Sequence, residues 1–113
     1  MVKTITTKEV KENLDNNKDF FLVDVLSSNS FEAKHIPGAK NVPYGPTFLE
    51  DFEKTMAVPK DANIAVYCAS SGCQLSVMAS DVLDEAGYTN VSHFKDGLAG
   101  WMQAGHKFEG EAA

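Results

Sequence analysis

Short apolar runs alternate with helix-patterned stretches along this chain, and this alternation constrains the fold more than any other feature. The clearest run, residues 63–67, leads through Cys68 and a few small residues into a helical pattern over residues 74–85. An earlier run, residues 20–23, ends at Asp24, and uninterrupted apolar runs are typical of strands that are buried on both faces. Strands that alternate with helices form parallel sheets, because each crossover packs back onto the sheet. We therefore expect an α/β fold with three layers, in which helices cover both faces of a mostly parallel sheet of about five strands.

The remaining elements are predicted from residues that begin and end helices and from local periodicity. Thr6 and Glu9 form a capping-box pattern that begins the first helix. Gly87 is expected to end the helix that follows Cys68, because glycine commonly occupies the position after a helix. Strands are predicted over residues 2–5, 20–23, 40–42, 63–67 and 91–94, and shorter helices around 30–34, after 47 and over 98–104.

Length and charge exclude several classes of protein. The 113 residues suit one domain, which we place at residues 1–108, with a disordered tail over 109–113. A net charge of −6 without any basic cluster argues against nucleic acid and anionic membranes as partners. We find neither a signal sequence nor a membrane-spanning run, and two cysteines five positions apart suit reduced thiols in the cytoplasm. The oligomeric state stays open.

Cys68 is the strongest candidate for chemistry. It follows a predicted buried strand and precedes a helix, which is where open α/β sheets bind ligands. The free N–H groups and the positive end of that helix favour a thiolate. Cys73 has two interpretations that the sequence leaves open: a residue without chemistry at the start of the helix, or a resolving thiol that attacks an oxidised Cys68. A zinc site is not expected, because no histidine pair or second cysteine pair accompanies the two thiols.

Two further residues are candidates for lining a pocket beside Cys68. Asp24 ends a predicted strand, and His35 precedes the turn at residues 36–38. A structural role is the competing interpretation for both, as a cap for Asp24 and as a tether of the turn for His35. His93 and His106 belong to no motif, and the sequence assigns them no role.

Several segments, taken in order, resemble the single-domain rhodanese family. Val66, Tyr67 and Cys68 match the V-Y-C sequence through which the family enters its active loop. The other matching segments extend over nearly the whole chain, at residues 24–25, 31, 35–39, 41–43, 86–91 and 97–101. The resemblance implies a rhodanese-like three-layer fold and sulfur transfer without a cofactor. Cys68 would take sulfane sulfur from a small donor such as thiosulfate, or from a persulfidated protein, and pass it from a persulfide to a thiol or another nucleophile.

The resemblance also implies how the loop after Cys68 would act. Small residues allow successive backbone N–H groups to curl around the sulfur and hold a persulfide anion. The residues expected to form this persulfide-binding loop are Ala69, Ser70, Ser71, Gly72, Cys73 and Gln74.

The loop departs from the usual family pattern in ways that bear on the sulfur donor. Cys73 stands where the family has an arginine, and the loop is two residues longer than the commonest form, so the chain resembles a variant with a second loop cysteine. Leu26 and Ser30 replace both members of a family charge pair. All ten basic residues are lysines, which weakens the assignment of dianionic thiosulfate and favours polysulfides, protein persulfides or small alkyl persulfides.

Two other functions are alternatives to sulfur transfer. Phosphatases of this fold, and arsenate reductases, are disfavoured because phosphoryl transfer to a cysteine needs a guanidinium, and the chain contains no arginine. The second rival is a sulfur carrier or redox-switch module without turnover, in which Cys68 and Cys73 alternate between dithiol and disulfide.

Overall fold

A central parallel sheet organises the computed structural model, which describes residues 2–16 and 19–112. Its five strands lie in the order β1-β5-β4-β2-β3, and every pair of neighbours is parallel. The α/β fold and the parallel five-stranded sheet predicted from the sequence are confirmed. The strands are β1 (Lys3–Thr4), β2 (Phe20–Asp24), β3 (Lys40–Asn41), β4 (Asn63–Tyr67) and β5 (Val91–His93).

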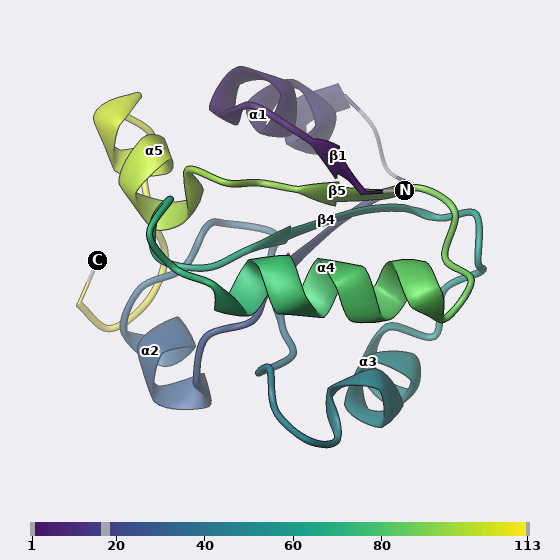
Figure 1. Cartoon of the computed structure of the whole chain (residues 1–113). Coiled ribbons are helices and arrows are strands. Elements are labelled where there is room, and N and C mark those ends of the chain that lie inside the picture. Colours follow the sequence, from purple (N-terminus) through teal and green to yellow (C-terminus); the bar gives the residue numbers. More distant parts are fainter. Residues whose placement is uncertain (1, 17–18, 113) are drawn as a thin grey trace.

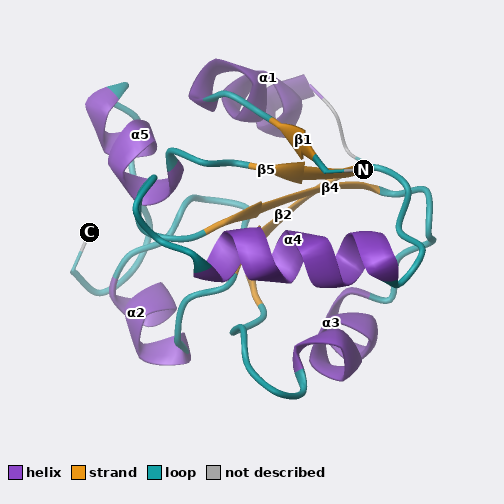
Figure 2. Cartoon of the chain, in the orientation of Figure 1, coloured by secondary structure: helices purple, strands orange, loops and turns teal. Residues whose placement is uncertain are grey.

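Helices cover both faces of this sheet (Figures 1 and 2). Helices α1 and α5 lie on one side of it, and α3 and α4 lie on the other. The capping box predicted at the start of α1 is confirmed, because the backbone N–H groups of Thr6 and Glu9 each donate to the other residue's side chain. The helices are α1 (Thr7–Asn16), α2 (Ser28–Ala33), α3 (Phe48–Met56), α4 (Leu75–Glu85) and α5 (Gly97–Gln103).

The central strand β4 supplies both hydrophobic cores, which explains its continuous apolar sequence. Ile64 and Val66 pack with side chains of α3 and α4, whereas Ala65 and Tyr67 pack with side chains of α1 and α5. Successive side chains of a strand point to opposite faces, so a central strand between two helical layers needs apolar residues at every position. The same alternation sends Cys68, the next residue, to the α4 side of the sheet.

The segment after residue 108, where the sequence predicts a disordered tail, is hydrogen-bonded over its described residues. Glu109 and His35 exchange two backbone hydrogen bonds of 2.8 and 2.9 Å. The N–H groups of Glu111 and Ala112 then donate to carbonyls at the end of α2. These bonds attach residues 109–112 to α2, while the last residue lies outside the described part of the chain.

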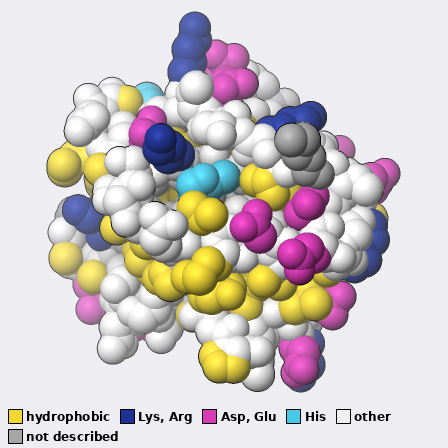
Figure 3. Space-filling view, viewed as in Figure 1, with side chains coloured by type: hydrophobic (Ala, Val, Ile, Leu, Met, Phe, Trp, Pro, Cys, Tyr) yellow, Lys and Arg dark blue, Asp and Glu magenta, His cyan; other side chains and the backbone are white. Residues whose placement is uncertain are grey.

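Within the described ranges, no helix combines the length and the apolar composition needed to cross a membrane. On the face shown in Figure 3, hydrophobic side chains gather between α4 and α3, and acidic side chains lie next to them over α4. The charged surface of this face is therefore mainly negative, as the net charge of the sequence indicates.

Candidate active site

Cys68 directly follows β4 at the carboxyl edge of the sheet. Its neighbours on that edge are the ends of β2 and β5, because Asp24 is in register with Tyr67 and His93 is in register with Val66. Only 1% of Cys68 is exposed. The thiol position predicted to carry the chemistry is therefore buried at the centre of the sheet, where ligands bind in parallel α/β folds.

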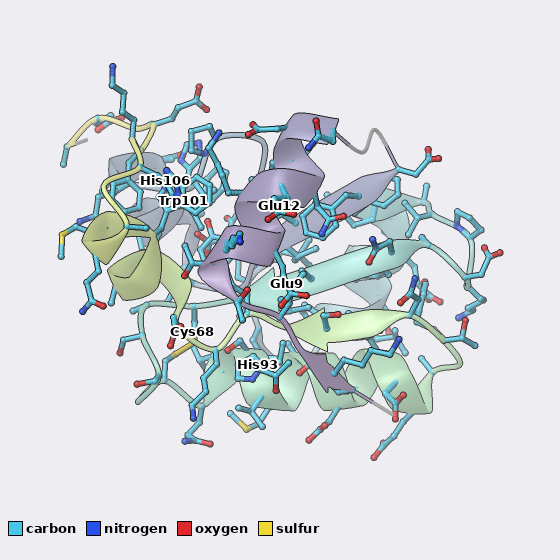
Figure 4. The ribbon with its side chains drawn as sticks, turned by 90° about the horizontal axis from the view of Figure 1, so that it is seen from above. Glu9, Glu12, Cys68, His93, Trp101 and His106 are labelled. Carbon is cyan, nitrogen blue, oxygen red and sulfur yellow. A yellow bond between two sulfur atoms is a disulfide. The ribbon has the colours of Figure 1, made fainter. Side chains whose placement is uncertain are left out.

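Cys68 and Cys73 form a disulfide, which is visible as the yellow bond in Figure 4. Their Cα atoms are 6.3 Å apart, within the range that a disulfide spans without moving the backbone. A turn returns the chain to the first sulfur, because the N–H of Cys73 donates to the carbonyl of Ser70 over 3.0 Å. The loop therefore brings the two thiols into bonding contact, a pairing that the sequence left open.

The amino end of α5 holds the first peptides of this loop. The N–H groups of Leu98 and Ala99 donate to the carbonyls of Cys68 and Ala69 over 3.1 and 2.9 Å. Gly97, with φ +54°, permits this approach, since a Cβ atom there would collide with the Cys68 carbonyl. The carbonyl and the N–H of a trans peptide point in opposite directions, so the N–H groups of Ala69 and Ser70 point away from α5.

Four consecutive N–H groups of the loop have no protein acceptors among the described residues. They belong to Ala69, Ser70, Ser71 and Gly72. Ala69, Ser71 and Gly72 are exposed, and α4 begins shortly afterwards at Leu75. Unpaired N–H groups beside a helix amino end favour an anion. Whether they converge on the sulfur of a reduced Cys68 stays a prediction, as does the assignment of the loop residues through Gln74.

Two residues that the sequence analysis did not assign complete the surroundings of Cys68. The Oγ atom of Ser76 lies 3.1 Å from the Cys68 Sγ and 2.7 Å from the His93 Nε2. Ser76 is buried in the first turn of α4, and His93 ends β5 and is partly exposed. A usable signal did exist, because a histidine at the end of a neighbouring parallel strand shares the carboxyl edge with Cys68.

The pKa of His93 is lowered mainly by burial. The positive charge of Lys95 lowers it further, and the negative charge of Asp81 on α4 opposes both effects. At neutral pH the ring is therefore held in its uncharged form, in which one of its nitrogens accepts a hydrogen bond.

Asp24 lies on the opposite face of the sheet from Cys68 and is completely buried. Its Oδ1 atom accepts a hydrogen bond of 2.8 Å from the N–H of Leu26. Burial raises the pKa of Asp24, and the Leu26 N–H and the neighbouring Tyr67 hydroxyl partly offset that rise. These contacts match the interpretation of Asp24 as a cap of the chain after β2, and a pocket role stays a prediction.

His35 is held by the backbone around it. Its Nδ1 atom is 2.6 Å from the carbonyl of Phe31, which assigns a proton to Nδ1, and its ring stacks on the Phe31 ring with 3.8 Å between centroids. The Tyr67 hydroxyl accepts from the N–H of the next residue, Ile36, over 3.2 Å. His35 therefore tethers the turn that it precedes, and its proposed place in a pocket has no support from these contacts.

A surface hollow of about 530 Å³ lies between α1 and α5, lined by Lys11, Leu14, Trp101 and His106 among others. Figure 4 shows Trp101 and His106 apart from Cys68. Cys68 does not line this hollow, so we derive the chemistry from the side chains around Cys68. Over the described ranges, no three His, Cys, Asp or Glu side chains form a group that could hold a metal ion.

Comparisons with known proteins identify the family of this fold. The family model described as Rhodanese-like domain matches residues 6–104. A probable adenylyltransferase/sulfurtransferase of Mycobacterium tuberculosis, MoeZ, is 26% identical over 100 residues, which are 88% of this chain and 24% of that protein. The chain therefore spans about a quarter of that relative. A putative mitochondrial thiosulfate sulfurtransferase of Schizosaccharomyces pombe is 30% identical over 94 residues, covering 75% of this chain and 65% of that protein.

A solved structure shows the same fold. The rhodanese-like domain of the Alr3790 protein from Anabaena superposes with a TM-score of 0.80 at 28% identity. The superposition covers 99% of this chain and 82% of that domain. The sheet and its helices thus belong to an architecture that is shared over 99% of this chain.

Proposed function

The chain belongs to the rhodanese-like domain family, and we propose that it is a sulfurtransferase that accepts sulfane sulfur on Cys68 as a persulfide. One observation carries the proposal: Cys68 directly follows the central strand, and the N–H groups of the next four residues have no acceptor among the described residues. The two relatives, a probable adenylyltransferase/sulfurtransferase and a putative thiosulfate sulfurtransferase, support sulfur transfer in general.

The proposed cycle begins with the dithiol form, which a dithiol reductant regenerates from the disulfide. The Cys68 thiolate attacks the outer sulfur of the donor, the donor's sulfur–sulfur bond breaks, and the donor leaves with the bonding electron pair. An acceptor thiolate then attacks the outer sulfur of the Cys68 persulfide. This second step forms the persulfide of the acceptor and returns the Cys68 thiolate, so no net oxidation takes place.

The donors that we propose are polysulfides, small alkyl persulfides or a persulfidated protein. A dianion such as thiosulfate would approach a protein of net charge −6, with neither arginine nor lysine in the loop over residues 68–74. Backbone N–H groups alone would have to hold its second charge. The acceptor is a thiol, and a reducing cytoplasm would suit a cycle that requires the dithiol form.

The disulfide favours a second candidate function, a redox-responsive sulfur carrier. In this scheme the Cys73 thiolate attacks the inner sulfur of a Cys68 persulfide. The outer sulfur leaves as hydrosulfide with its electron pair, and the two cysteines remain joined. Each sulfur delivered in this way stops the protein until a reductant restores the thiols, so turnover would depend on that reductant.

Intact-protein mass spectrometry on reduced protein tests the proposal. Thiosulfate, a polysulfide and an alkyl persulfide are supplied separately to the wild type and to the Cys68→Ser and Cys73→Ser variants. We expect the wild type to gain one sulfur atom, most readily from the persulfide donors, and Cys68→Ser to gain none. No mass gain from any donor, or an equal gain in Cys68→Ser, would overturn the assignment.

The decay of the persulfide separates the two functions. If Cys73 resolves it, the wild type passes to the disulfide with release of hydrosulfide, and Cys73→Ser keeps the added sulfur for longer. Equal lifetimes in the two proteins would remove Cys73 from the mechanism and leave ordinary sulfur transfer.

A further inference from the structure

We propose that Ser76 and His93 form a proton relay that keeps Cys68 in its thiolate form. The hydroxyl of Ser76 lies between the Cys68 Sγ, at 3.1 Å, and the His93 Nε2, at 2.7 Å. Each member of the relay comes from a different element: the end of β4, the first turn of α4 and the end of β5. The inference rests on the proposed function only in taking Cys68 as the nucleophile.

The reduced state allows only one direction for a relay that ionises Cys68. Ser76 has one hydroxyl proton, so it can donate to one neighbour while it accepts from the other. In the dithiol, the Cys68 thiol donates to the Ser76 Oγ and the Ser76 hydroxyl donates to the His93 Nε2. That order requires an uncharged His93 with its proton on Nδ1. In the disulfide, the Cys68 Sγ has no proton and can only accept.

Burial is the reason that Cys68 needs such a relay. The residue is 1% exposed, and removal from water disfavours the charged thiolate relative to the thiol. The guanidinium that would offset this effect is absent from the chain. A base linked to the sulfur by hydrogen bonds offsets this destabilisation of the thiolate. Once the base has taken the proton, the thiolate lies near an imidazolium and is stabilised by the opposite charge.

The proton transfer is balanced at each atom. The S–H bond of Cys68 breaks and its proton binds to the Ser76 Oγ, while the Ser76 proton passes to the His93 Nε2. The products are a thiolate, an unchanged serine hydroxyl and an imidazolium. His93 is partly exposed, so the proton can leave for water from the far end of the relay. The reverse order returns a proton to the sulfur when the persulfide is discharged.

The surroundings of His93 keep its ring neutral and therefore able to accept a proton from Ser76. Its neighbours in the sheet, Thr4 on β1 and Val66 on β4, are uncharged. The charged groups that act on the ring are Lys95, just after β5, and Asp81 on α4. Burial and Lys95 keep the ring neutral before the transfer, and Asp81 favours the imidazolium that forms. Acidic side chains over α4 are evident on the face shown in Figure 3.

The thiolate content of Cys68 can be measured without any sulfur donor. In the Cys73→Ser background, which has one thiol and no internal disulfide, the rate of alkylation by iodoacetamide is recorded as a function of pH. We expect His93→Gln and Ser76→Ala each to raise the apparent pKa of Cys68 by about one unit, so that alkylation at neutral pH slows about tenfold. His106→Gln is the matched control and should leave the profile unchanged, because His106 packs against Trp101.

A measurement on the unsubstituted protein keeps the test independent of folding defects. The titration of His93 is followed by NMR in the dithiol and disulfide forms. The relay predicts a higher pKa of His93 in the dithiol, where a thiolate stabilises the imidazolium. Identical titrations, or unchanged alkylation profiles in folded variants, would overturn the proposal. Shifted profiles together with no sulfur gain from any donor would contradict sulfur transfer and leave the relay standing.

Discussion

The carboxyl end of β4 carries one polar cluster on each face of the sheet, and the two differ in what their side chains bind. On the α4 face, Cys68, Ser76 and His93 bind one another side chain to side chain. On the opposite face, Tyr67 and Asp24 accept hydrogen bonds from backbone N–H groups. A side chain that satisfies a backbone group is fixed by the fold, because leaving that group unpaired costs about 1–3 kcal/mol.

The difference separates a reactive cluster from a structural one. A hydrogen-bonded series of side chains that begins at a buried nucleophile and ends at a partly exposed histidine can change its protonation state without disturbing the backbone. Tyr67 and Asp24 instead each hold a backbone N–H, of the turn at Ile36 and of the chain after β2, and neither contacts Cys68. The following variants test this division, beginning with the largest expected effect.

Gly97→Ala should cause the largest loss of stability. The new Cβ atom would collide with the Cys68 carbonyl, and the residue would also have to keep φ at +54°. We expect the free energy of unfolding in urea to fall by about 3 kcal/mol, from overpacking and the left-handed backbone together. Gly87→Ala is the control, with φ +98° but no atom within 4 Å of the added Cβ, and should cost only about 1–2 kcal/mol.

The outcome of this pair shows how the reactive cluster is held. Equal losses of unfolding free energy in the two variants would mean that α5 moves to accommodate the new side chain. The peptides after β4 would then not be fixed by α5. A much larger loss in Gly97→Ala would support rigid attachment of the loop through the Cys68 and Ala69 carbonyls.

Tyr67→Phe should lower stability without changing the chemistry of Cys68. The substitution leaves the N–H of Ile36 without its acceptor, and we expect unfolding to become easier by about 2 kcal/mol. The pH profile of Cys68 alkylation, measured in the Cys73→Ser background, should stay as it is. A shifted pH profile would show that the side chains on the two faces of β4 are energetically coupled, and the two clusters would then not be independent.

The sequence predicted the fold because the signals for it are local and repeated. Apolar runs at 20–23 and 63–67 became β2 and β4, and the capping box at Thr6 and Glu9 began α1. The edge strands β1 and β3 are only two residues long, shorter than predicted. The paired backbone of residues 109–112 had no local signal at all, since its partners lie in α2 and at His35.

The candidate site was predicted unevenly for the same reason. Cys68 was evident from its place after an apolar run, and its match to a family motif named its chemistry. Ser76 and His93 reach Cys68 only through parallel register and the docking of α4, and no motif marks them. Asp24 and His35 stand in motifs, yet the hydrogen bonds of the Asp24 Oδ1 and the His35 Nδ1 are with the backbone. The motifs identified these positions without separating reactive side chains from structural ones.

Asp24→Asn should have the smallest effect of the three, and it should increase stability. Burial raises the pKa of Asp24, so the folded chain binds this proton more tightly than the unfolded chain does. Stability is therefore lost as the pH rises from the ordinary value of 3.8 through the folded pKa, and the loss stays constant above it. Asparagine has no charge to bury and keeps an oxygen for the N–H of Leu26. The variant should thus be more stable than the wild type at neutral pH, with the gain vanishing in acid.

Urea unfolding across acidic and neutral pH measures this gain, with Asp61→Asn as the control at an exposed aspartate. The control should show no comparable gain at any pH. A loss of stability in Asp24→Asn at neutral pH would mean that the carboxylate is stabilised in its charged form, which is the behaviour expected of a functional pocket. Asp24 would then be a functional side chain, and the two faces of β4 would no longer differ in carrying a reactive and a structural cluster.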